Sequence, residues 1–447
     1  MPVSNREANF KLNNQNDRER MNSRKLGPLQ INHERPQKGA KVALIGWSIP
    51  TIEAIQQIKR PYIVISHEGY KEYAEQHKIP FLSWDFGKPN HYQEVYERSE
   101  ELFDQLVNID VGHTISVFEE LVEWAGALNA RLREDPAVFD HSILFRDKAM
   151  MKRRAHLGGL KVGVFEEVEN KEEVRRFFKR VNYSLLKNHQ NEDADPIHFK
   201  ALNKAGAAGH RMIFSEEDIE NKLTDQSFPG LVESHLSGME ISCEVFIYKG
   251  EILFLNMTEY VKLGYSSMVP PSAEIEYYRP YIHKEVEKLI QAFDIQFGMI
   301  HPEFFITDTE EIYFGEVAYR IPGGHIFELI QKVYGFNPFG AHILCCDPHT
   351  TLEELEEFLP KEVKPNGHAG SFLVYPRKKN ATRVQVPRDL EEHPSFEKHT
   401  LYKPTTAKFQ DTDEGYGNHL GTVFFHGEDS GEISQLLTDY VDYDFYV

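Results

Sequence analysis

The chain has 447 residues, of which 40% are hydrophobic and 27% are charged, a composition typical of a globular protein with two or three domains. Its net charge of -20 argues against nucleic acid or an anionic membrane as a general partner. Three cysteines without a CxxC pair, together with the lack of a signal-peptide core or a long apolar run, predict a cytoplasmic protein that is neither secreted nor membrane-spanning.

The N-terminal third predicts a tail followed by an α/β domain. Residues 1–38 are rich in Asn, Arg, Lys and Gln and lack apolar periodicity, which is typical of a disordered tail. In the domain expected over 39–140, short apolar strands alternate with helices, a pattern that indicates a parallel sheet. The GxGxxG fingerprint of dinucleotide-binding folds is absent. The predicted strands are 42–46, 62–66 and 79–82, and the predicted helices are 52–58, 72–77, 94–106 and 115–132.

The next segment, 141–230, is expected to form a separate lobe with a phosphate-gripping layout. A basic helix begins at Lys148, and a predicted strand carries Lys200 into a small-residue loop with Gly206 and Gly209. A lysine supplies a point charge for an anion, and such a loop brings backbone N–H groups close to it. Taken singly, such a stretch is more often a solvated lysine beside an ordinary turn. The other predicted elements are strands at 161–165 and 197–200 and a helix at 171–180.

The rest of the chain predicts a central antiparallel sheet over 231–365 and a separate β-rich unit over 366–447. Two alternating strands around the Lys249–Gly250 turn read as a hairpin. The predicted strands are 241–248, 252–257, 371–375, 383–386, 407–410 and 421–426, and the predicted helices are 327–334, 338–345 and 432–440.

A second hairpin, near 300–320, carries two acids in an unusual register. If Asp308 pairs with Glu311 at the turn, then Phe305 faces Phe314, and Glu303 faces Glu316 on the same side. Facing carboxylates repel each other, and aromatic neighbours lower the local dielectric. A divalent cation bound by both carboxylates relieves this repulsion. The alternative is a solvent-facing hairpin with scattered acids.

Arg320 follows the second acid by four residues and projects from the same face if the strand continues. Gly323 and Gly324 then turn the chain and expose backbone N–H groups. His301 is ambiguous, because a ring packed in the sheet is the more frequent role for such a residue, with a substrate contact as the alternative.

The order of these features resembles the ATP-grasp superfamily, and within it the L-amino-acid ligases and related carboxylate–amine ligases of small-peptide and antibiotic pathways. The resemblance covers 39–447, and its specific motifs lie between 146 and 325. It rests on His301-Pro302-Glu303, on the Glu-Val-Ala-Tyr-Arg-Ile-Pro-Gly-Gly-His run that ends at His325, and on Gly421-Thr-Val-Phe in the C-terminal unit.

This resemblance implies an α/β and α+β protein with an N-terminal parallel α/β domain, a lid lobe, a central antiparallel sheet and a C-terminal β-rich lobe. It also implies roles for individual residues. They are Lys148 and Lys200 on the ATP phosphates, Gly206 and Gly209 in the phosphate loop, Glu233, Ser234 and Leu236 at the adenine, Glu240 at the ribose, Glu303 and Glu316 on Mg²⁺ (with Mn²⁺ as an alternative), and Arg320 with the N–H groups of Gly323 and Gly324 on the acyl group.

The sequence departs from the family pattern at three positions. Ala318 stands where the pattern has an asparagine that ligates metal, and Lys262 and Tyr265 stand where amino-acid ligases often have an acid and a histidine. We therefore expect Lys262 and Tyr265 to help select the substrate, with Lys262 pairing with a substrate carboxylate.

The function implied is ATP-dependent activation of a small carboxylate as an acylphosphate, followed by attack of an amine, with ADP and phosphate as products. One alternative acceptor is the thiol of a carrier protein. Another alternative, of a different class, is a non-catalytic nucleotide-binding protein on this fold. The expected partners are small molecules rather than nucleic acid or membrane, and a dimer is the expected assembly if the chain oligomerises.

Overall fold

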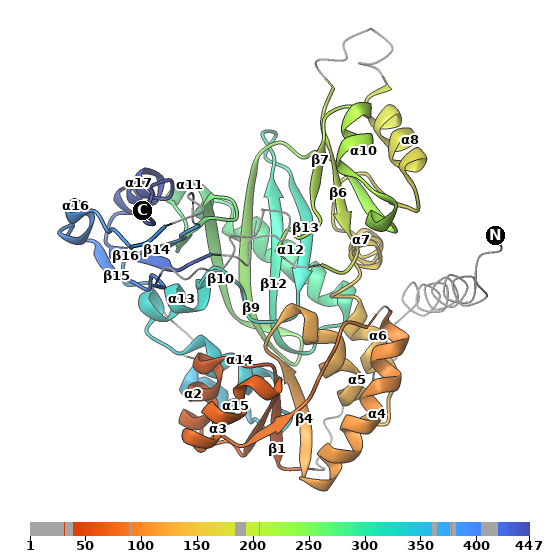
Figure 1. The fold of residues 1–447 in the computed structure, drawn as a ribbon, viewed down its shortest axis with the longest axis vertical. Coiled ribbons are helices and arrows are strands. Elements are labelled where there is room, and N and C mark those ends of the chain that lie inside the picture. The colour runs from red at the N-terminus through yellow and green to blue at the C-terminus, as the bar shows by residue number, and fades with distance from the viewer. Residues whose placement is uncertain are drawn as a thin grey trace.

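The computed structural model describes residues 31, 39–89, 91–183, 194–204, 206–359, 364–375, 377, 381–403 and 419–447. They form three sheets: a parallel sheet in the N-terminal part, an antiparallel sheet in the lid, and an eight-stranded sheet between them (Figure 1). The expected N-terminal parallel sheet and central antiparallel sheet are confirmed. The predicted tail lies outside the described residues, apart from residue 31.

The N-terminal sheet has the order β3-β2-β1-β4 with parallel pairing throughout. One prediction is wrong here: residues 115–132 are not a single helix, because residues 111–116 form a buried strand beside β1. Asn129 pairs with the backbone N–H and C=O of Thr114 at 2.9 and 2.8 Å, so the buried strand keeps its polar groups satisfied. The elements are β1 (Lys41–Ile45), α2 (Ile49–Gln57), β2 (Tyr62–Ser66), α3 (Lys71–Gln76), β3 (Phe81–Ser83), α4 (Tyr92–Asn108), β4 (Val111–Ser116), α5 (Val122–Leu132) and α6 (Ala137–Ile143).

The lid sheet has the order β5-β8-β6-β7, and its neighbours are antiparallel. Alternate residues Ile197 and Phe199 are buried in a small core of the lid. The strand predicted at 161–165 starts only at Phe165, because Lys161 O instead accepts a hydrogen bond from Phe314 N of the central sheet at 2.8 Å. The elements are α7 (Lys148–Leu157), β5 (Phe165–Val168), α8 (Lys171–Val181), β6 (Ile197–Ala201), β7 (Arg211–Ile213), α10 (Glu216–Lys222) and β8 (Gly230–Ser234).

The eight-stranded sheet has the order β13-β12-β9-β10-β11-β14-β16-β15. The predicted hairpin around Lys249 and Gly250 is confirmed. Helix α14 packs on β12 and β9 and also on α2, so it joins this sheet to the N-terminal one. The elements up to that helix are β9 (Met239–Tyr248), β10 (Glu251–Lys262), β11 (Ser266–Val269), α11 (Ala273–Glu276), α12 (Arg279–Phe293), β12 (Phe297–Ile306), β13 (Ile312–Ala318), α13 (Ile326–Tyr334) and α14 (Pro338–Cys346).

The C-terminal strands continue this sheet rather than forming a sheet of their own, because β14 pairs with β11. The strand predicted at 383–386 is wrong: only an isolated bridge joins Val384 to Tyr446. The strand predicted at 407–410 lies outside the described residues. The last elements are α15 (Leu352–Phe358), β14 (His368–Leu373), α16 (Arg388–Glu391), β15 (Phe396–His399), β16 (Thr422–Gly427) and α17 (Ser430–Tyr440).

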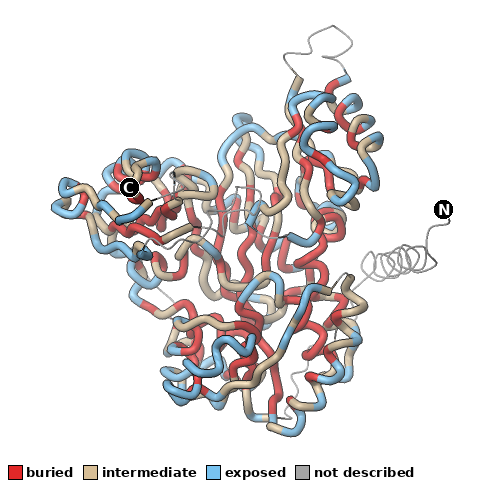
Figure 2. The backbone as a smooth tube through the Cα atoms, in the orientation of Figure 1, coloured by how far each residue is buried: buried red, intermediate tan, exposed pale blue. Residues whose placement is uncertain are grey.

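Burial follows these layers (Figure 2). One apolar cluster runs from β1 and α5 through α7 to the β9–β12 part of the central sheet, and a second runs from α2 to α13 and α14. The N-terminal and central sheets therefore share continuous cores, whereas the lid has its own small core. This arrangement fixes α7 and the β12–β13 hairpin, and the lid strands carry the rest of the candidate site.

Candidate functional site

The two acids of the β12–β13 hairpin face each other, as predicted, but the register that brings them together differs from the prediction. Glu303 pairs with Glu316, while Phe304, not Phe305, pairs with Phe314. The pairing shifts by one residue at this point, so Gly315 is an extra residue in β13. The strand pairing next to the turn is therefore offset by one residue from the pairing at the acids, and the bulge at Gly315 accounts for this offset.

Lys148 neutralises one of these acids. It is the first residue of α7, and the helix is capped by Asp147, whose Oδ1 accepts hydrogen bonds from Ala149 N and Met150 N at 3.1 and 3.0 Å. The Lys148 ammonium donates to Glu316 Oε2. Burial alone would raise the pKa of Glu316, but Lys148 and Lys200 bring it down to about 2, so this carboxylate stays ionised.

Lys200, on the lid strand β6, ion-pairs with Glu233 on the neighbouring strand, with 2.7 Å between Nζ and Oε2. The other oxygen of Glu233 lies 2.6 Å from Lys152 Nζ, and Lys152 and Glu233 are both almost completely buried. The sequence analysis missed Lys152. The signal for it was its position one helical turn after Lys148, which places both ammonium groups on one face of α7.

The carboxyl group of Glu240 lies beside that of Glu303. Burial, together with the neighbouring carboxylate of Glu303, raises the pKa of Glu240 well above its ordinary value, and a side-chain hydrogen bond joins the two groups. When two carboxyl groups lie this close, a bound cation can take the place of the proton between them. The residues present therefore suit a hard divalent cation.

Such a cation would need further ligands from outside the chain. Among the residues that the structure describes, no group of three or more His, Cys, Asp or Glu side chains has the arrangement of a metal site. Mg²⁺ commonly takes one or two carboxylates and completes its shell with phosphate oxygens and water. The pair Glu303 and Glu316 matches that donor set, with Ala318 contributing no ligand.

Arg320 lies past the end of β13 and is held by an acid that the sequence analysis did not identify. Its Nε is 2.7 Å from Glu119 Oε2, and Arg146 Nη1 is 2.9 Å from Glu119 Oε1. Burial alone would raise the pKa of Glu119, but Arg320 and Arg146 hold it below its ordinary value. Arg146 also binds Glu123 and the backbone oxygen of Asn203, so it joins α5, α7 and the lid loop.

The four predicted glycines lie outside helices and strands. A side-chain carbon at Gly323 would meet no atom within 4 Å, and Gly324 has a φ of +62°. Gly206 and Gly209 also have positive φ, +57° and +74°, the conformation expected of a tight loop.

Ser234 closes the lid strand against the preceding segment. Its Oγ accepts from Val164 N at 3.1 Å, and its N–H donates to Val164 O at 2.9 Å. Leu236, the third predicted residue of this segment, follows two residues later and is half-buried.

The three predicted substrate residues divide into two places. His301 is buried in the sheet, with Nδ1 3.0 Å from Glu244 and Nε2 3.6 Å from Glu303, and these acids raise its pKa to about 9 against the effect of burial. Its ring thus packs in the sheet and also touches the site.

Lys262 and Tyr265 lie at the C-terminal strands. Lys262 Nζ is 2.7 Å from Asp442, in an exposed pair that Arg377 also joins, and it stacks over the ring of Tyr265 at 4.7 Å. Lys262 therefore has a partner within the chain.

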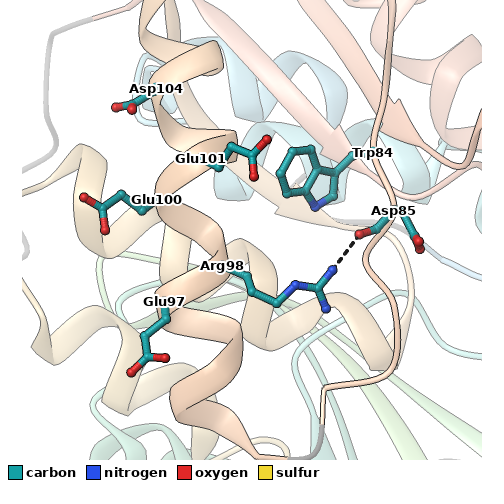
Figure 3. Close-up of a pocket in the computed structure, with 7 residues that line it drawn as sticks. All are labelled: Trp84, Asp85, Glu97, Arg98, Glu100, Glu101 and Asp104. Atoms are coloured by element: carbon teal, nitrogen blue, oxygen red, sulfur yellow. Dashed lines mark hydrogen bonds between the residues drawn. The ribbon is translucent and has the colours of Figure 1, made fainter.

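A separate hollow of about 640 Å³ lies on the N-terminal domain, between α4 and the segment after β3 (Figure 3). Arg98 crosses it to donate to Asp85 O at 2.9 Å. It contains none of the predicted site residues, and its acidic walls would repel a phosphate group. Its remaining lining residues are Trp84, Glu97, Glu100, Glu101 and Asp104.

Comparison with known proteins gives one related sequence and many related folds. No family model matches the chain. It is 23% identical over 262 residues to an L-arginine-specific L-amino acid ligase of Bacillus subtilis, a match that spans 55% of this chain and 60% of that relative.

Two solved structures illustrate the likeness of fold. An L-amino acid ligase from Bacillus licheniformis has a TM-score of 0.68 at 14% identity, covering 92% of this chain and 98% of that one. An N5-carboxyaminoimidazole synthase from Aspergillus clavatus, solved with ADP and an aminoimidazole ribonucleotide, has a TM-score of 0.65 at 13% identity, covering 91% and 99%. These likenesses show that the chain has the ATP-grasp fold. No helix in the described part of the chain is long and apolar enough to cross a membrane.

Proposed function

We propose that this chain is an ADP-forming ligase that activates the carboxylate of an amino acid and joins it to an amine. The observation that carries the proposal is the convergence of opposite charges from three elements: Glu303 and Glu316 on the hairpin, Lys148 on α7, and Lys200 on the lid. The named relative, an amino acid ligase, supports the choice of an amino acid as the donor.

ATP would bind between the lid sheet and the central sheet. Lys148 and Lys200 would neutralise phosphate oxygens. Their ammonium groups already bind the carboxylates of Glu316 and Glu233, so both lysines lie where negative charge is stabilised. Glu303 and Glu316 would hold Mg²⁺, which, when bound, offsets the charge of the transferring phosphoryl group. Glu240, beside Glu303, would face the ribose, and Glu233, Ser234 and Leu236 would face the adenine.

Arg320 orients the donor acid. A guanidinium suits a planar carboxylate because it can donate to both of its oxygens. Nε of Arg320 donates to Glu119 and Nη1 donates to Ile321 O, and these two bonds fix the orientation of the guanidinium. The carboxylate oxygen then attacks the γ-phosphorus, ADP leaves, and an acylphosphate forms. When the amine attacks the acyl carbon, Arg320 and the N–H groups of Gly323 and Gly324 stabilise the oxyanion, and phosphate leaves.

The test is product analysis over pairs of amino acids with ATP and magnesium. ADP is the expected nucleotide product, because the metal ion that Glu303 and Glu316 would hold would assist transfer of the γ-phosphoryl group. With the amine omitted, hydroxylamine is expected to trap the activated acid as a hydroxamate. AMP as the stoichiometric product would overturn the proposed mechanism and the roles of Glu303, Glu316 and Arg320.

A further inference from the structure

Three histidines form a continuous row on the lid sheet. His198 Nδ1 lies 2.9 Å from His210 Nε2, and His198 Nε2 lies 3.0 Å from His235 Nδ1. The rings lie edge to edge and nearly in one plane, with centroids 5.1 and 5.3 Å apart and planes inclined by 12° and 19°. Both nitrogens of His198 are therefore engaged, and we call these three residues the histidine row.

The histidine row occupies the charged face of the lid sheet. His198 lies two residues before Lys200 on β6 and is paired with Glu233 on β8, so by period two all three side chains share one face. The intervening residues Ile197 and Phe199 point into the lid core. The row thus lies beside the groups proposed to bind the nucleotide, on the side away from that core.

The row also links β6 to the residues that lie just beyond its ladder pairs with β7 and β8. His210 directly follows Gly209, at the end of the loop with positive φ, and His235 directly follows Ser234. Hydrogen bonds of the β6 ladder reach as far as Arg211 and Ser234 and stop there. His198 therefore holds both ends just beyond the last ladder pairs.

The chemistry of the row suits a structural link and excludes a metal site. Burial and the neighbouring Lys200 lower the pKa of His210 to about 4, and burial with His210 and Lys200 lowers that of His198 to about 4. A neutral imidazole has one N–H, so His198 donates to one neighbour and accepts from the other. A metal would need the nitrogens to converge, whereas the two contacts use opposite nitrogens of His198.

We propose that His198 is a positioning residue that holds the Gly206–Gly209 loop and the segment after Ser234 in the conformation that grips a nucleotide. This inference rests on the proposed function, since it concerns the same site. It predicts that loss of the row weakens nucleotide binding and leaves the chemical step at saturating ATP unchanged, because Glu303, Glu316 and Arg320 belong to other elements.

The experiment compares three variants of the full chain by calorimetric titration with ADP and magnesium. His198→Phe keeps an aromatic ring of similar size but removes both hydrogen bonds, and it is expected to raise the dissociation constant roughly ten-fold, as for two lost hydrogen bonds of typical strength. His198→Gln restores a donor and an acceptor and is expected to stay within about three-fold of the unaltered chain. His283→Phe, an exposed histidine on α12, is the matched control and should leave binding unchanged.

Steady-state kinetics provide the second readout. For His198→Phe the KM for ATP should rise in parallel with the dissociation constant, with kcat within about two-fold, whereas a general loss of fold would lower kcat and the melting temperature together. If His198→Phe does not fold, His235→Phe removes one bond at an exposed position and should give a smaller rise. Binding of ADP by His198→Phe as tightly as by the unaltered chain overturns this inference alone. Failure of the unaltered chain to bind ADP overturns the proposed function and this inference with it.

Discussion

The charged side chains of the candidate site are buried or half-buried, and they are paired with groups of opposite charge. Glu233 lies between Lys152 and Lys200, and Glu316 lies against Lys148. A buried ion pair adds little net stability, but removal of one partner leaves an uncompensated charge in a poorly solvated place. The arrangement is therefore better explained by a ligand that exchanges places with these partners than by stability alone.

Glu316→Gln should lower kcat for ADP release about 100-fold or more, because the variant loses a metal ligand and metal ions supply several kcal/mol of transition-state stabilisation. The melting temperature should fall only modestly, because the Lys148–Glu316 pair that the variant breaks is half-buried. Glu311 lies on the same hairpin and forms an exposed ion pair with Lys161. Glu311→Gln is the control, and this variant should retain its activity. A near-normal rate for Glu316→Gln at ordinary magnesium would contradict the metal role of this residue.

His342, on α14, gives a prediction about pH. Burial lowers its pKa to about 4, so the unfolded chain takes up a proton below about pH 6.5 that the folded chain cannot bind. The contribution of this residue to stability is complete above pH 6.5 and is lost as the pH falls from 6.5 towards 4, by up to about 3 kcal/mol. His342→Met should flatten this part of the profile, measured by urea unfolding at several pH values, and the exposed His283→Met should not. Parallel profiles for His342→Met and the unaltered chain would contradict the assignment.

At the scale of elements, the β12–β13 hairpin owes its function to an irregularity. A regular ladder continued from the turn would place Glu303 opposite Gly315 and turn Glu316 away from it. The extra residue restores the pairing, and a glycine suits that position because a side chain would come within 2.9 Å of Glu303 O. The bulge thus re-aims one acid toward the other.

Gly315→Ala tests this role of the bulge. Since the added methyl group would press on the backbone of β12, the free energy of unfolding should fall by about 1–3 kcal/mol. The rate of ADP release should fall as well, because Glu316 is displaced. Gly69→Ala, where the nearest atom would be 3.5 Å away, should change stability by no more than about 0.5 kcal/mol. Full activity of Gly315→Ala would show that the bulge does not position Glu316.

At the scale of the molecule, the site is built where the lid, the central sheet and the N-terminal domain meet. Arg146 bonds to Glu119 and Glu123 and to a lid backbone oxygen, and Lys148 connects α7 to the hairpin. The lid packs around its own small core, so its position depends on such polar contacts more than on shared apolar burial. A ligand that bridges the lid and the central sheet should therefore stabilise the whole chain.

ADP with magnesium should raise the melting temperature. At a concentration 100 times its dissociation constant, a ligand that binds only the folded state adds about 2.7 kcal/mol to the free energy of unfolding. Lys200→Met should lose most of this increment, whereas Lys222→Met on α10 of the same lobe should keep it. An equal shift in all three proteins would contradict nucleotide binding at Lys200.

The sequence by itself determined the order of elements and the facing acids. Alternating apolar residues predicted the β9–β10 hairpin and the alternation of strands and helices, because periodicity depends only on local geometry. The pairing of Glu303 with Glu316 was also predicted, although its assumed register was wrong: the Phe305–Phe314 pairing does not form. The pairing at the turn differs from the prediction by one residue, and the bulge shifts the pairing back by one residue, so Glu303 and Glu316 still face each other.

Only the tertiary structure decided which charges meet. Glu119 was missed because nothing in its local sequence distinguishes it from a solvated residue. Lys152 lies one helical turn after Lys148, but this spacing does not show which acid it meets. Lys152 on α7 contacts Phe314 of β13, and Glu119, before α5, contacts Arg320 after β13. Both contacts join segments that are more than 100 residues apart in the sequence. The long run 115–132 likewise reads as one helix until the parallel partner β1 pairs with its first residues. Long-range pairing sets both outcomes, and local periodicity carries no information about it.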